Sequence, residues 1–367
     1  MGTPEPEKPK LDWHQTETNV TISIYTRRKK MILKEHIMTD YMDDTSHLLI
    51  LVRLPDDNTN YNVAYKLEKP IDDFTVKASY TTGKIEVNLK KSVPERWNCI
   101  GTPLKGHDSW VQEGSLPSED IPTHRPWKLI EKTSITHDVS HYVFQPKEKL
   151  HFHVPCGHHV QFKMNIEDIE FERSYTPVFA DLDLQAYSNE KRFDKNLHFL
   201  IKTYPKGVLT PNLNALPIGA EIQMSNPTGK FNVEILTDIT NIILLAAGTG
   251  ITPMCKLIQY IQVLNSQDNI KRHITLLDFN KTFGDIIWFD QLERYDELLQ
   301  VHHILSQEEH PEYHKGRVNQ ALLEELLPAK HDKSKVFICG PIPFYKECEK
   351  SLEPLHYRKN EIIRFEG

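Results

Sequence analysis

The sequence predicts a multidomain protein with an all-β sandwich, then an antiparallel β-barrel, then an α/β domain built on a parallel sheet. Its 367 residues are enough for two or three domains. Residues 19–25 and 84–90 alternate apolar and polar side chains, as half-buried strands do. A second β-rich region follows from Trp127. After about residue 236 apolar strands alternate with helical segments, which predicts a parallel sheet.

Composition excludes several classes of protein. Lys plus Arg is 44 against 51 for Asp plus Glu, so the net charge is −7 and no general basic surface is available for nucleic acid. The five cysteines form no CxxC pair and are odd in number, which favours free thiols in a reducing compartment over a disulfide scaffold. No apolar run approaches the roughly 18 residues that a membrane span needs.

Composition shifts predict the domain boundaries. The first residues alternate proline with charge, and a second Gly-, Pro- and Ser-rich stretch lacks periodicity, so both are expected to be linkers. The predicted segments are 1–10 (linker or tail), 11–98 (sandwich), 99–124 (linker), 125–235 (barrel) and 236–367 (α/β domain, with helices expected at 287–300 and 318–327).

A glycine-rich turn, Gly248–Thr249–Gly250, follows the apolar strand 241–247 and precedes a helix with Pro253 in its first turn. Backbone N–H groups at a helix N-terminus, approached closely where Cβ is absent, suit a pyrophosphate. A tight strand-to-helix turn that binds nothing explains the two glycines equally well. Other segments must decide between these readings.

The stretch Cys339–Gly340–Pro341 follows another apolar strand and is expected at the same edge of the sheet, where open α/β folds bind their ligands. Cys339 has no histidine at an activating spacing, so we expect an inert buried thiol rather than a nucleophile.

In the barrel region, Arg173, Ser174, Tyr175 and Thr176 lie in one extended stretch. Arginine can bind a phosphate with two hydrogen bonds, tyrosine can stack on a planar ring, and threonine can bond to a ring heteroatom. Taken alone, such a tetrapeptide is more typical of an ordinary strand. The histidines at 151, 153, 158 and 159 lack a Cys or carboxylate that would complete a metal site, so none is predicted.

Together and in this order, these segments resemble the NADH–cytochrome b5 reductase branch of the ferredoxin–NADP reductase superfamily. The resemblance runs from about Pro126 to Phe365. It rests on the motifs at 127–132, 155–160, 173–178, 201–204, 226–229, 248–253 and 339–341.

The resemblance implies an FAD-binding barrel and a nicotinamide-nucleotide domain, with NADH as donor and NADPH as the alternative. Hydride would pass from NADH to the flavin, and single electrons to a haem protein. The implied catalytic residues are Thr176, Thr252 and Cys339. The implied cofactor-binding residues are Arg173, Ser174, Tyr175, Thr176, Lys202, Tyr204, Gly207, Leu209, Thr210, Gly248, Thr249, Gly250, Thr252, Asn280, Asp285, Cys339, Gly340 and Pro341.

Several positions depart from the family pattern. Ser174 replaces a proline, Val208–Leu209 replaces Lys–Met, and Ala247 replaces the first glycine of the turn. The missing lysine removes one positive charge from the phosphate site. In the resembled family, an Asp that matches Asp285 of this chain disfavours the 2′-phosphate of NADPH by charge repulsion. The positive charge of Lys281, in the same loop, could reach that phosphate and offset the repulsion.

The N-terminal region resembles the CS domain of the p23-like co-chaperones, through Asp12–Trp13 and the run from Gly83 to Trp97. This implies binding of a protein partner, although Trp13 and Trp97 are expected to seal the sandwich. A CS domain before a reductase suggests the soluble fusion in which a cytochrome b5 domain precedes both. The chain has no His–Pro–Gly–Gly haem motif, so we expect no haem here. The haem partner is then either a domain upstream in a longer chain, which the Pro-rich start favours, or a separate protein.

Two functions follow as hypotheses. The first is a cytoplasmic, FAD-dependent NAD(P)H oxidoreductase, with association with the endoplasmic reticulum as a further expectation. The alternative is a chaperone-associated scaffold that uses its CS domain and has a vestigial reductase.

Overall fold

The computed structural model describes residues 8–26, 32, 36–54, 59–79, 82–112, 123–146, 149–182, 195–267, 270–294 and 298–365. Residues 1–7 of the predicted tail and 113–122 of the predicted linker lie outside these ranges. The chain forms two compact units. The first comprises Met1–Trp127, Pro146–Pro155 and Met224–Lys230, and the second comprises the rest.

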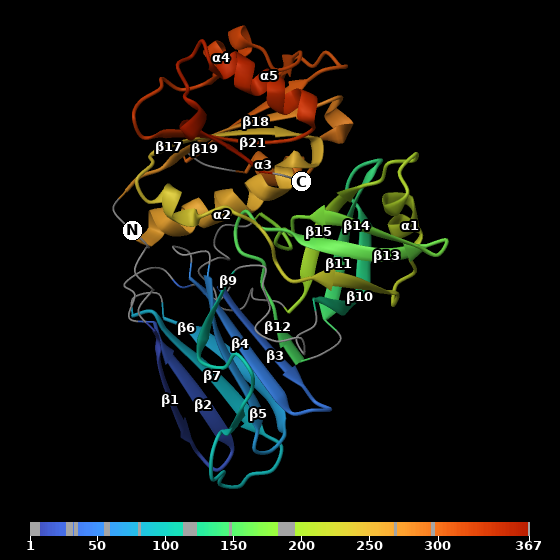
Figure 1. The fold of residues 1–367 in the computed structure, drawn as a ribbon. Helices are drawn as coiled ribbons and strands as arrows, with labels where there is room; N and C mark the ends of the chain where they lie inside the picture. The colour runs from blue at the N-terminus through green and yellow to red at the C-terminus, as the bar shows by residue number, and fades with distance from the viewer. Residues whose placement is uncertain are drawn as a thin grey trace. The chain divides into compact units, whose positions relative to one another are not determined.

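The first unit is a β-sandwich (Figure 1, blue to teal, with the strand at 149–151 in green). One sheet has the order β1-β2-β7-β6, made of β1 (Lys10–Gln15), β2 (Asn19–Tyr25), β7 (Lys84–Lys91) and β6 (Ile71–Ala78). The other has the order β12-β3-β4-β5-β8, with β9 also on β5; its strands are β12 (Lys149–His151), β3 (Ile37–Met42), β4 (His47–Leu54), β5 (Thr59–Leu67), β8 (Gly101–Pro103) and β9 (Ser109–Gln112). Alternate residues such as Ile85, Val87 and Leu89 of β7 fill the core between the sheets, which confirms the predicted sandwich.

Three short strands extend this sandwich beyond its predicted boundaries. Residues 101–103 and 109–112, expected in a linker, pair with β5, and residues 149–151, expected in the barrel, pair with β3. They cover strand edges that would otherwise expose unpaired backbone groups. Segments of two to four residues are too short to show period-2 alternation, so the sequence did not reveal them. Trp97 is buried in the core and Trp13 packs against it, as predicted.

The barrel sheet has the order β14-β13-β16-β10-β11-β15. Its strands are β10 (His124–Ser134), β11 (Val139–Pro146), β13 (Val160–Ile166), β14 (Ile169–Tyr175), β15 (Leu197–Lys202) and β16 (Glu221–Ser225), with helix α1 (Leu209–Ala215) before β16. Phe144, Phe162 and Phe199 meet edge to face in its core. The predicted antiparallel barrel is confirmed.

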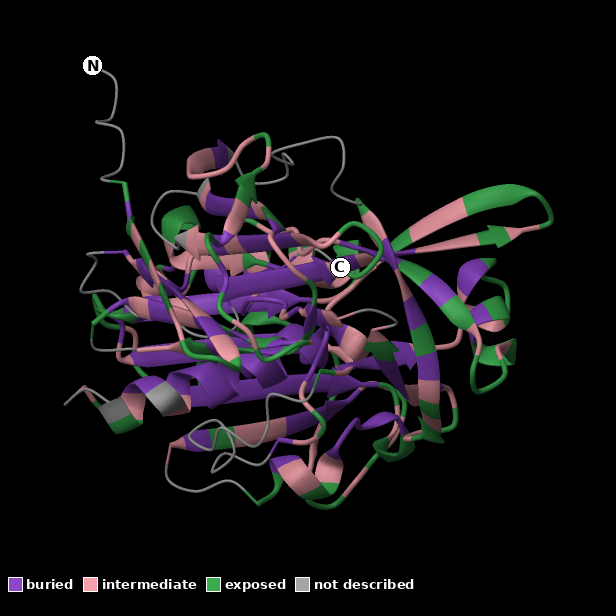
Figure 2. Ribbon diagram, turned by 90° about the horizontal axis from the view of Figure 1, so that it is seen from below, coloured by how far each residue is buried: buried purple, intermediate pink, exposed green. Residues whose placement is uncertain are grey.

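The C-terminal sheet is wholly parallel, in the order β20-β19-β18-β17-β21-β22. Its strands are β17 (Asn241–Ala247), β18 (His273–Asn280), β19 (Leu299–Leu305), β20 (His314–Lys315), β21 (Ser334–Cys339) and β22 (Ile362–Arg364); its helices are α2 (Ile251–Gln267), α3 (Phe289–Leu292), α4 (Gln320–Leu326) and α5 (Ile342–Leu352). The central strands are buried (Figure 2). This confirms the α/β domain.

The helix predicted at 287–300 is wrong. Of the described residues 287–294 and 298–300, only Phe289–Leu292 is helical, and Leu299 already begins β19. Trp288 has a left-handed backbone (φ 56°), which breaks a regular helix at its start. Among the described residues, no helix combines the length and the apolar character needed to cross a membrane.

Candidate functional site

The candidate site begins at the carboxyl edge of the parallel sheet, where β17, β18 and β21 end. Ala246 lies opposite Cys339, and Ala247 lies opposite Phe279. The turns that follow these strands are therefore neighbours, as predicted for the glycine turn and for Cys339–Pro341. Ligands of open α/β sheets bind at this edge.

Gly248 is the residue of the glycine turn that leaves room for a ligand. Its φ is +55°, and a Cβ added there would meet nothing within 4 Å. The Thr252 hydroxyl donates to the Thr249 carbonyl at 3.1 Å and holds the turn against the first turn of α2. The turn thus presents an open backbone surface at the start of a 17-residue helix, an arrangement that suits a phosphate.

Gly250 is confined by the neighbouring turn. A Cβ added to Gly250 would lie 2.3 Å from the carbonyl oxygen of Cys339. Its missing side chain therefore lets the two turns pack together, and the predicted close approach to a dinucleotide stays a prediction. Gly340 is equally confined, because an added Cβ would come within 2.9 Å of the Ala247 methyl group. Ala247, the departure from the family pattern, thus packs against a glycine.

Cys339 is a packing residue in this arrangement. Its side chain is buried, and burial raises the pKa of its thiol to about 12. A protonated thiol is a poor nucleophile, so the rejection of covalent chemistry agrees with the structure. Pro341 immediately precedes α5 and ends the turn.

The carboxylate of Asp285 is buried and hydrogen-bonded within its own loop. Its side chain is 8% exposed, and Oδ2 accepts hydrogen bonds from the Thr282 backbone N–H (2.9 Å) and hydroxyl (2.7 Å). Burial raises the pKa of Asp285, but the Thr282 bonds and the charge of Lys202 outweigh it, so the net pKa is lowered. Asn280, also buried, donates to Asp278 Oδ2 at 2.8 Å. Whether Asp285 selects between nicotinamide nucleotides stays a prediction.

Lys202, at the end of β15, links the barrel to this loop. Its Nζ lies 2.6 Å from Asp138 Oδ2 and 3.8 Å from Asp285 Oδ1. His137, Asp138 and Asp285 offer metal-type ligand atoms within 4.8 Å of one another. The Lys202 ammonium already lies beside both carboxylates, so a metal ion would compete with it for the same charges.

On the barrel, β14 carries the Arg173–Thr176 stretch. Arg173 is exposed, and its described hydrogen bond goes to the neighbouring Glu172 carbonyl at 2.7 Å. Tyr175 is half-buried with its ring 4.7 Å from that of Phe162, and burial raises the pKa of its hydroxyl to about 12. Ser174 and Thr176 are half-buried. The guanidinium is therefore positioned where an anion can reach it.

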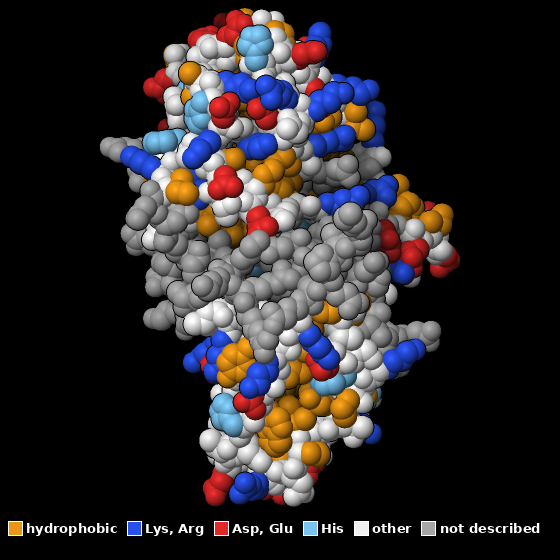
Figure 3. Space-filling model, turned by 60° about the vertical axis from the view of Figure 1, so that its left-hand side comes forward, with side chains coloured by type: hydrophobic (Ala, Val, Ile, Leu, Met, Phe, Trp, Pro, Cys, Tyr) orange, Lys and Arg blue, Asp and Glu red, His pale blue; other side chains and the backbone are white. Residues whose placement is uncertain are grey.

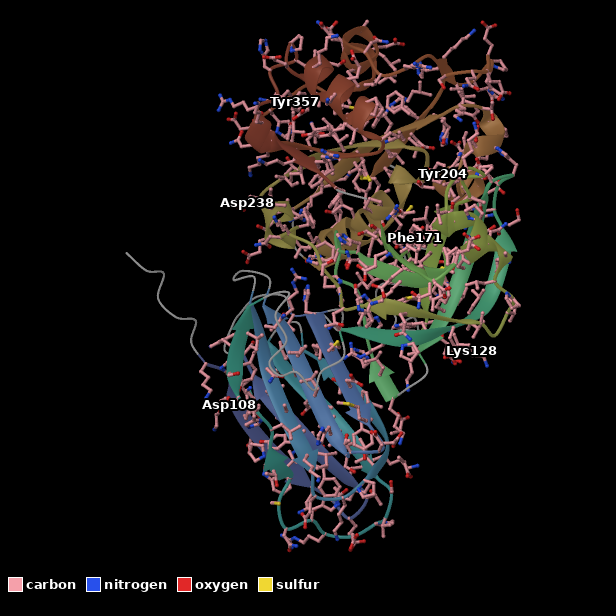
Figure 4. The ribbon with its side chains drawn as sticks, turned by 45° about the vertical axis from the view of Figure 1, so that its right-hand side comes forward. Asp108, Lys128, Phe171, Tyr204, Asp238 and Tyr357 are labelled. Carbon is pink, nitrogen blue, oxygen red and sulfur yellow. The ribbon has the colours of Figure 1, made fainter. Side chains whose placement is uncertain are left out.

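The loop after β15 is a closed turn with an exposed ring. The Tyr204 backbone N–H donates to Thr210 Oγ1 at 3.0 Å, and the Gly207 N–H donates to the Tyr204 carbonyl at 2.8 Å. The Tyr204 side chain, labelled in Figure 4, is 54% exposed. Leu209 buries its side chain, so its predicted contact with a cofactor would be made by its backbone, and this stays a prediction.

An aromatic cluster beside Asn280 was missed by the sequence analysis. The ring of Phe283, 36% exposed, lies nearly parallel to His310 (5.4 Å, 12°) and Tyr313 (5.9 Å, 10°), and Phe289 meets it edge on. Phe283 and Phe289 follow β18 in the chain, whereas His310 and Tyr313 lie together in the segment after β19, so no periodic signal marks the cluster. A flat apolar ring can stack on this surface.

Phe365, at which the resemblance to the reductase family ends, is buried. It stacks on Phe337 at 17°, and Phe231 meets it edge on.

Family models match three parts of the chain. Residues 126–233 match the oxidoreductase FAD-binding domain, 244–350 the oxidoreductase NAD-binding domain, and 9–91 the CS domain. These matches follow the predicted order of domains.

Curated relatives match nearly the whole chain. Cytochrome b5 reductase 4 of Rattus norvegicus is 35% identical over 369 residues, covering 98% of this chain and 68% of the relative. That of Homo sapiens is 36% identical over 368 residues, with the same shares.

Solved structures are similar to this chain in the same domains. The CS-b5R domains of human Ncb5or in the NAD+ form share 34% identity with a TM-score of 0.80, covering 98% of this chain and 100% of that one. The cytochrome b5 reductase domain of Ulva prolifera nitrate reductase, 24% identical with a TM-score of 0.55, covers 66% of this chain and 97% of its own and shows a shared fold.

Proposed function

The chain belongs to the cytochrome b5 reductase 4 family, and from this premise we propose that it passes electrons from NADH through FAD to a cytochrome b5-type haem protein. The family and the FAD- and NAD-binding domains make it a flavin-dependent NAD(P)H oxidoreductase. The observation that carries the proposal is the open surface of Gly248, next to the end of β18, in the same unit as exposed Arg173 and Tyr204.

The barrel residues fit FAD. Arg173 is exposed, and its described hydrogen bond goes to an uncharged carbonyl oxygen rather than to a carboxylate. The positive charge of its guanidinium is therefore available to a phosphate. Tyr204 keeps more than half of its side chain exposed, which suits stacking on a planar group. Bound FAD supplies the redox chemistry: it takes two electrons with a hydride and releases electrons one at a time.

The residues of the parallel sheet fit NADH. The backbone at Gly248 can face the pyrophosphate at the start of α2. The Phe283 ring offers a stacking surface beside the same sheet edge. Thr176 and Thr252 orient the two rings in this proposal, and the buried Cys339 supports the turn beside the nicotinamide. No side-chain acid or base is needed, because positioning is the protein's contribution to hydride transfer.

The electron acceptor, the partner of the CS domain and the location are the finer parts of the proposal. The relatives' name supports a cytochrome b5 acceptor, and the chain's own sequence contains no haem motif. Lys and Arg side chains gather over the α/β domain on the face in Figure 3, which suits docking of a negatively charged protein. Free cysteines support a reducing, cytoplasmic location, with association with the endoplasmic reticulum. A protein partner of the CS domain is proposed from its family match.

Purified protein tests the proposal directly. We expect a yellow protein that releases FAD, not FMN, on heating, is bleached by NADH without oxygen, and then reduces added cytochrome b5. Protein that binds no flavin after addition of FAD would overturn the assignment and favour the scaffold alternative. Flavin reduction without reduction of cytochrome b5 would overturn the acceptor alone.

A further inference from the structure

We propose that Gln259 and Lys256 of helix α2 are positioning residues for hydride transfer, acting through residues 178–182, a segment that we call the tether. The helix and the tether both belong to the second compact unit. The inference rests on the proposed function, because it takes the flavin to be bound by the barrel and the nicotinamide by the parallel sheet. Its readout is flavin reduction by NADH.

A polar stripe runs along one face of α2. Thr252, Lys256 and Gln259 are spaced by four and then three residues, so they lie on the same side of the helix. These three residues are 8%, 5% and 2% exposed, and the other residues of 251–261 are buried and largely apolar. Burying an amide or an ammonium group is costly without a partner, so the stripe has to meet groups that compensate it.

The tether supplies partners for this stripe. The Nε2 group of Gln259 donates to the Asp181 carbonyl at 2.9 Å. The Lys256 ammonium lies 5.4 Å from the centre of the Phe179 ring. A cation over an aromatic face gains most where water is excluded, and Lys256 is buried. The two side chains of α2 therefore hold the tether against the helix.

Both ends of the tether are fixed as well. The N–H of Val178 donates to the carbonyl of His198 in β15 at 2.8 Å, which fixes the first end to the barrel. The N–H of Leu182, a buried residue, donates to Gln291 Oε1 of α3 at 2.7 Å, which fixes the other end to the α/β domain. The four steps between these ends span at most about 14 Å, so the tether is a short connection without slack for large movements.

The tether joins the two threonines that orient the rings in the proposed function. Thr176 lies two residues before Val178, and Thr252 shares its face of α2 with Lys256 and Gln259. A shift of the tether along α2 therefore moves one threonine relative to the other. Hydride transfer needs reacting atoms about 3–3.5 Å apart, and a misplacement of about 1 Å can slow it about 100-fold. The stripe thus acts on the reaction through the tether rather than by contact with a cofactor.

The test uses the FAD-loaded full chain and follows flavin reduction by NADH in anaerobic stopped flow, normalised to bound flavin. Gln259→Leu replaces the amide by an apolar side chain of similar size and removes the hydrogen bond to the tether. We expect reduction at saturating NADH to slow about tenfold, with the Kd for NADH within about twofold of the parent, because neither cofactor loses a contact. A parent-like rate would overturn the proposal.

Gln262→Leu is the matched control, because it makes the same substitution three positions further along the same helix. Both amide atoms of Gln262 are buried without a hydrogen-bond partner among the described residues. We therefore expect a parent-like rate of reduction and a Tm no lower than that of the parent. Equal slowing by the two variants would assign the effect to the stability of α2 and overturn the proposal.

A second pair of variants tests the tether if Gln259→Leu does not fold. Lys256→Met removes the cation from the Phe179 ring and keeps an unbranched side chain, whereas Lys256→Arg keeps a cation at this position. We expect slow reduction in Lys256→Met and recovery towards the parent rate in Lys256→Arg, with the Kd for NADH unchanged in both. Equal rates in these two variants would overturn the proposal.

NADH deuterated at the transferred hydrogen identifies the step that is slowed. In Gln259→Leu we expect an isotope effect at least as large as that of the parent, because hydride transfer itself is slower. Loss of the isotope effect would place the slow step elsewhere and overturn the proposal. A parent protein that NADH does not reduce would instead refute the proposed function, so the two failures are distinguishable.

Discussion

The glycine turns of the parallel sheet and the cofactor face of the barrel are built in opposite ways. At the sheet edge, Gly250 lies against the Cys339 carbonyl and Gly340 against Ala247, so backbone packing sets the shape. On the barrel, Arg173 is exposed and Tyr204 is 54% exposed. The first region is shaped before any ligand arrives, whereas the second offers side chains that a ligand can engage.

This difference teaches where substitutions act. A change in a turn shaped by backbone packing strains the fold and the ligand site together, because the added atoms meet backbone that cannot move aside. A change of an exposed side chain affects the ligand while leaving the apoprotein nearly unchanged. The predictions below test this contrast, from the largest effect to the smallest.

Gly250→Val should have the largest effect. Its Cβ would lie 2.3 Å from the Cys339 carbonyl oxygen, so we expect a loss of about 3 kcal/mol in unfolding free energy and at least a tenfold rise in KM for NADH, with FAD still bound. Denaturant unfolding and steady-state kinetics measure both.

Gly248→Ala is the control for Gly250→Val. It meets open space, and its cost is the strain of a side chain at φ +55°, about 1 kcal/mol. Equal destabilisation by the two substitutions would show that packing of the two turns does not shape the site.

Arg173→Ala should weaken FAD binding by about 2 kcal/mol, because a charge-assisted contact to phosphate is lost. The Tm of the apoprotein should not change, since the described hydrogen bond of Arg173 goes to the adjacent Glu172 carbonyl. Flavin titration of apoprotein measures the first quantity, and thermal unfolding the second. Unchanged FAD affinity would remove Arg173 from the site.

Asp285→Thr should raise kcat/KM for NADPH about tenfold, or about 1.4 kcal/mol, with little loss for NADH. The carboxylate faces Thr282 and Lys202 rather than open solvent, so its removal also frees the Lys202 charge. Both nucleotides are compared on both proteins at fixed ionic strength. If the ratio does not move, Lys281 is the next residue to test.

Acidification should destabilise the barrel slightly. Burial, and next the neighbouring His198, lower the pKa of His141 to about 4, and the two rings are linked by a 3.1 Å Nε2···Nδ1 contact. Between pH 6.5 and 4 the unfolded chain therefore binds more protons, so unfolding free energy falls as pH falls, by on the order of 1 kcal/mol after screening. In His141→Gln this pH dependence, followed by denaturant titration, should shrink; an unchanged slope would contradict the assignment.

The sequence by itself determined the three domains, their order and the family, because these depend on local signals. Alternation marks strands such as 84–90, and the glycine turn with Pro253 marks a strand-to-helix junction. Short motifs in fixed order carried the resemblance. The same short motifs made it possible to predict from the sequence that Arg173, Tyr204 and Gly248 belong to the candidate site.

Only the tertiary structure decided what each residue meets across the fold. Gly250 packs on Cys339, Asp285 turns towards Thr282 and Lys202, and Leu209 enters the core. The strands at 101–103, 109–112 and 149–151 join the sandwich through pairing with distant residues. Such contacts join positions far apart in sequence, and their energies depend on backbone geometry and burial, which a linear pattern of residues does not contain.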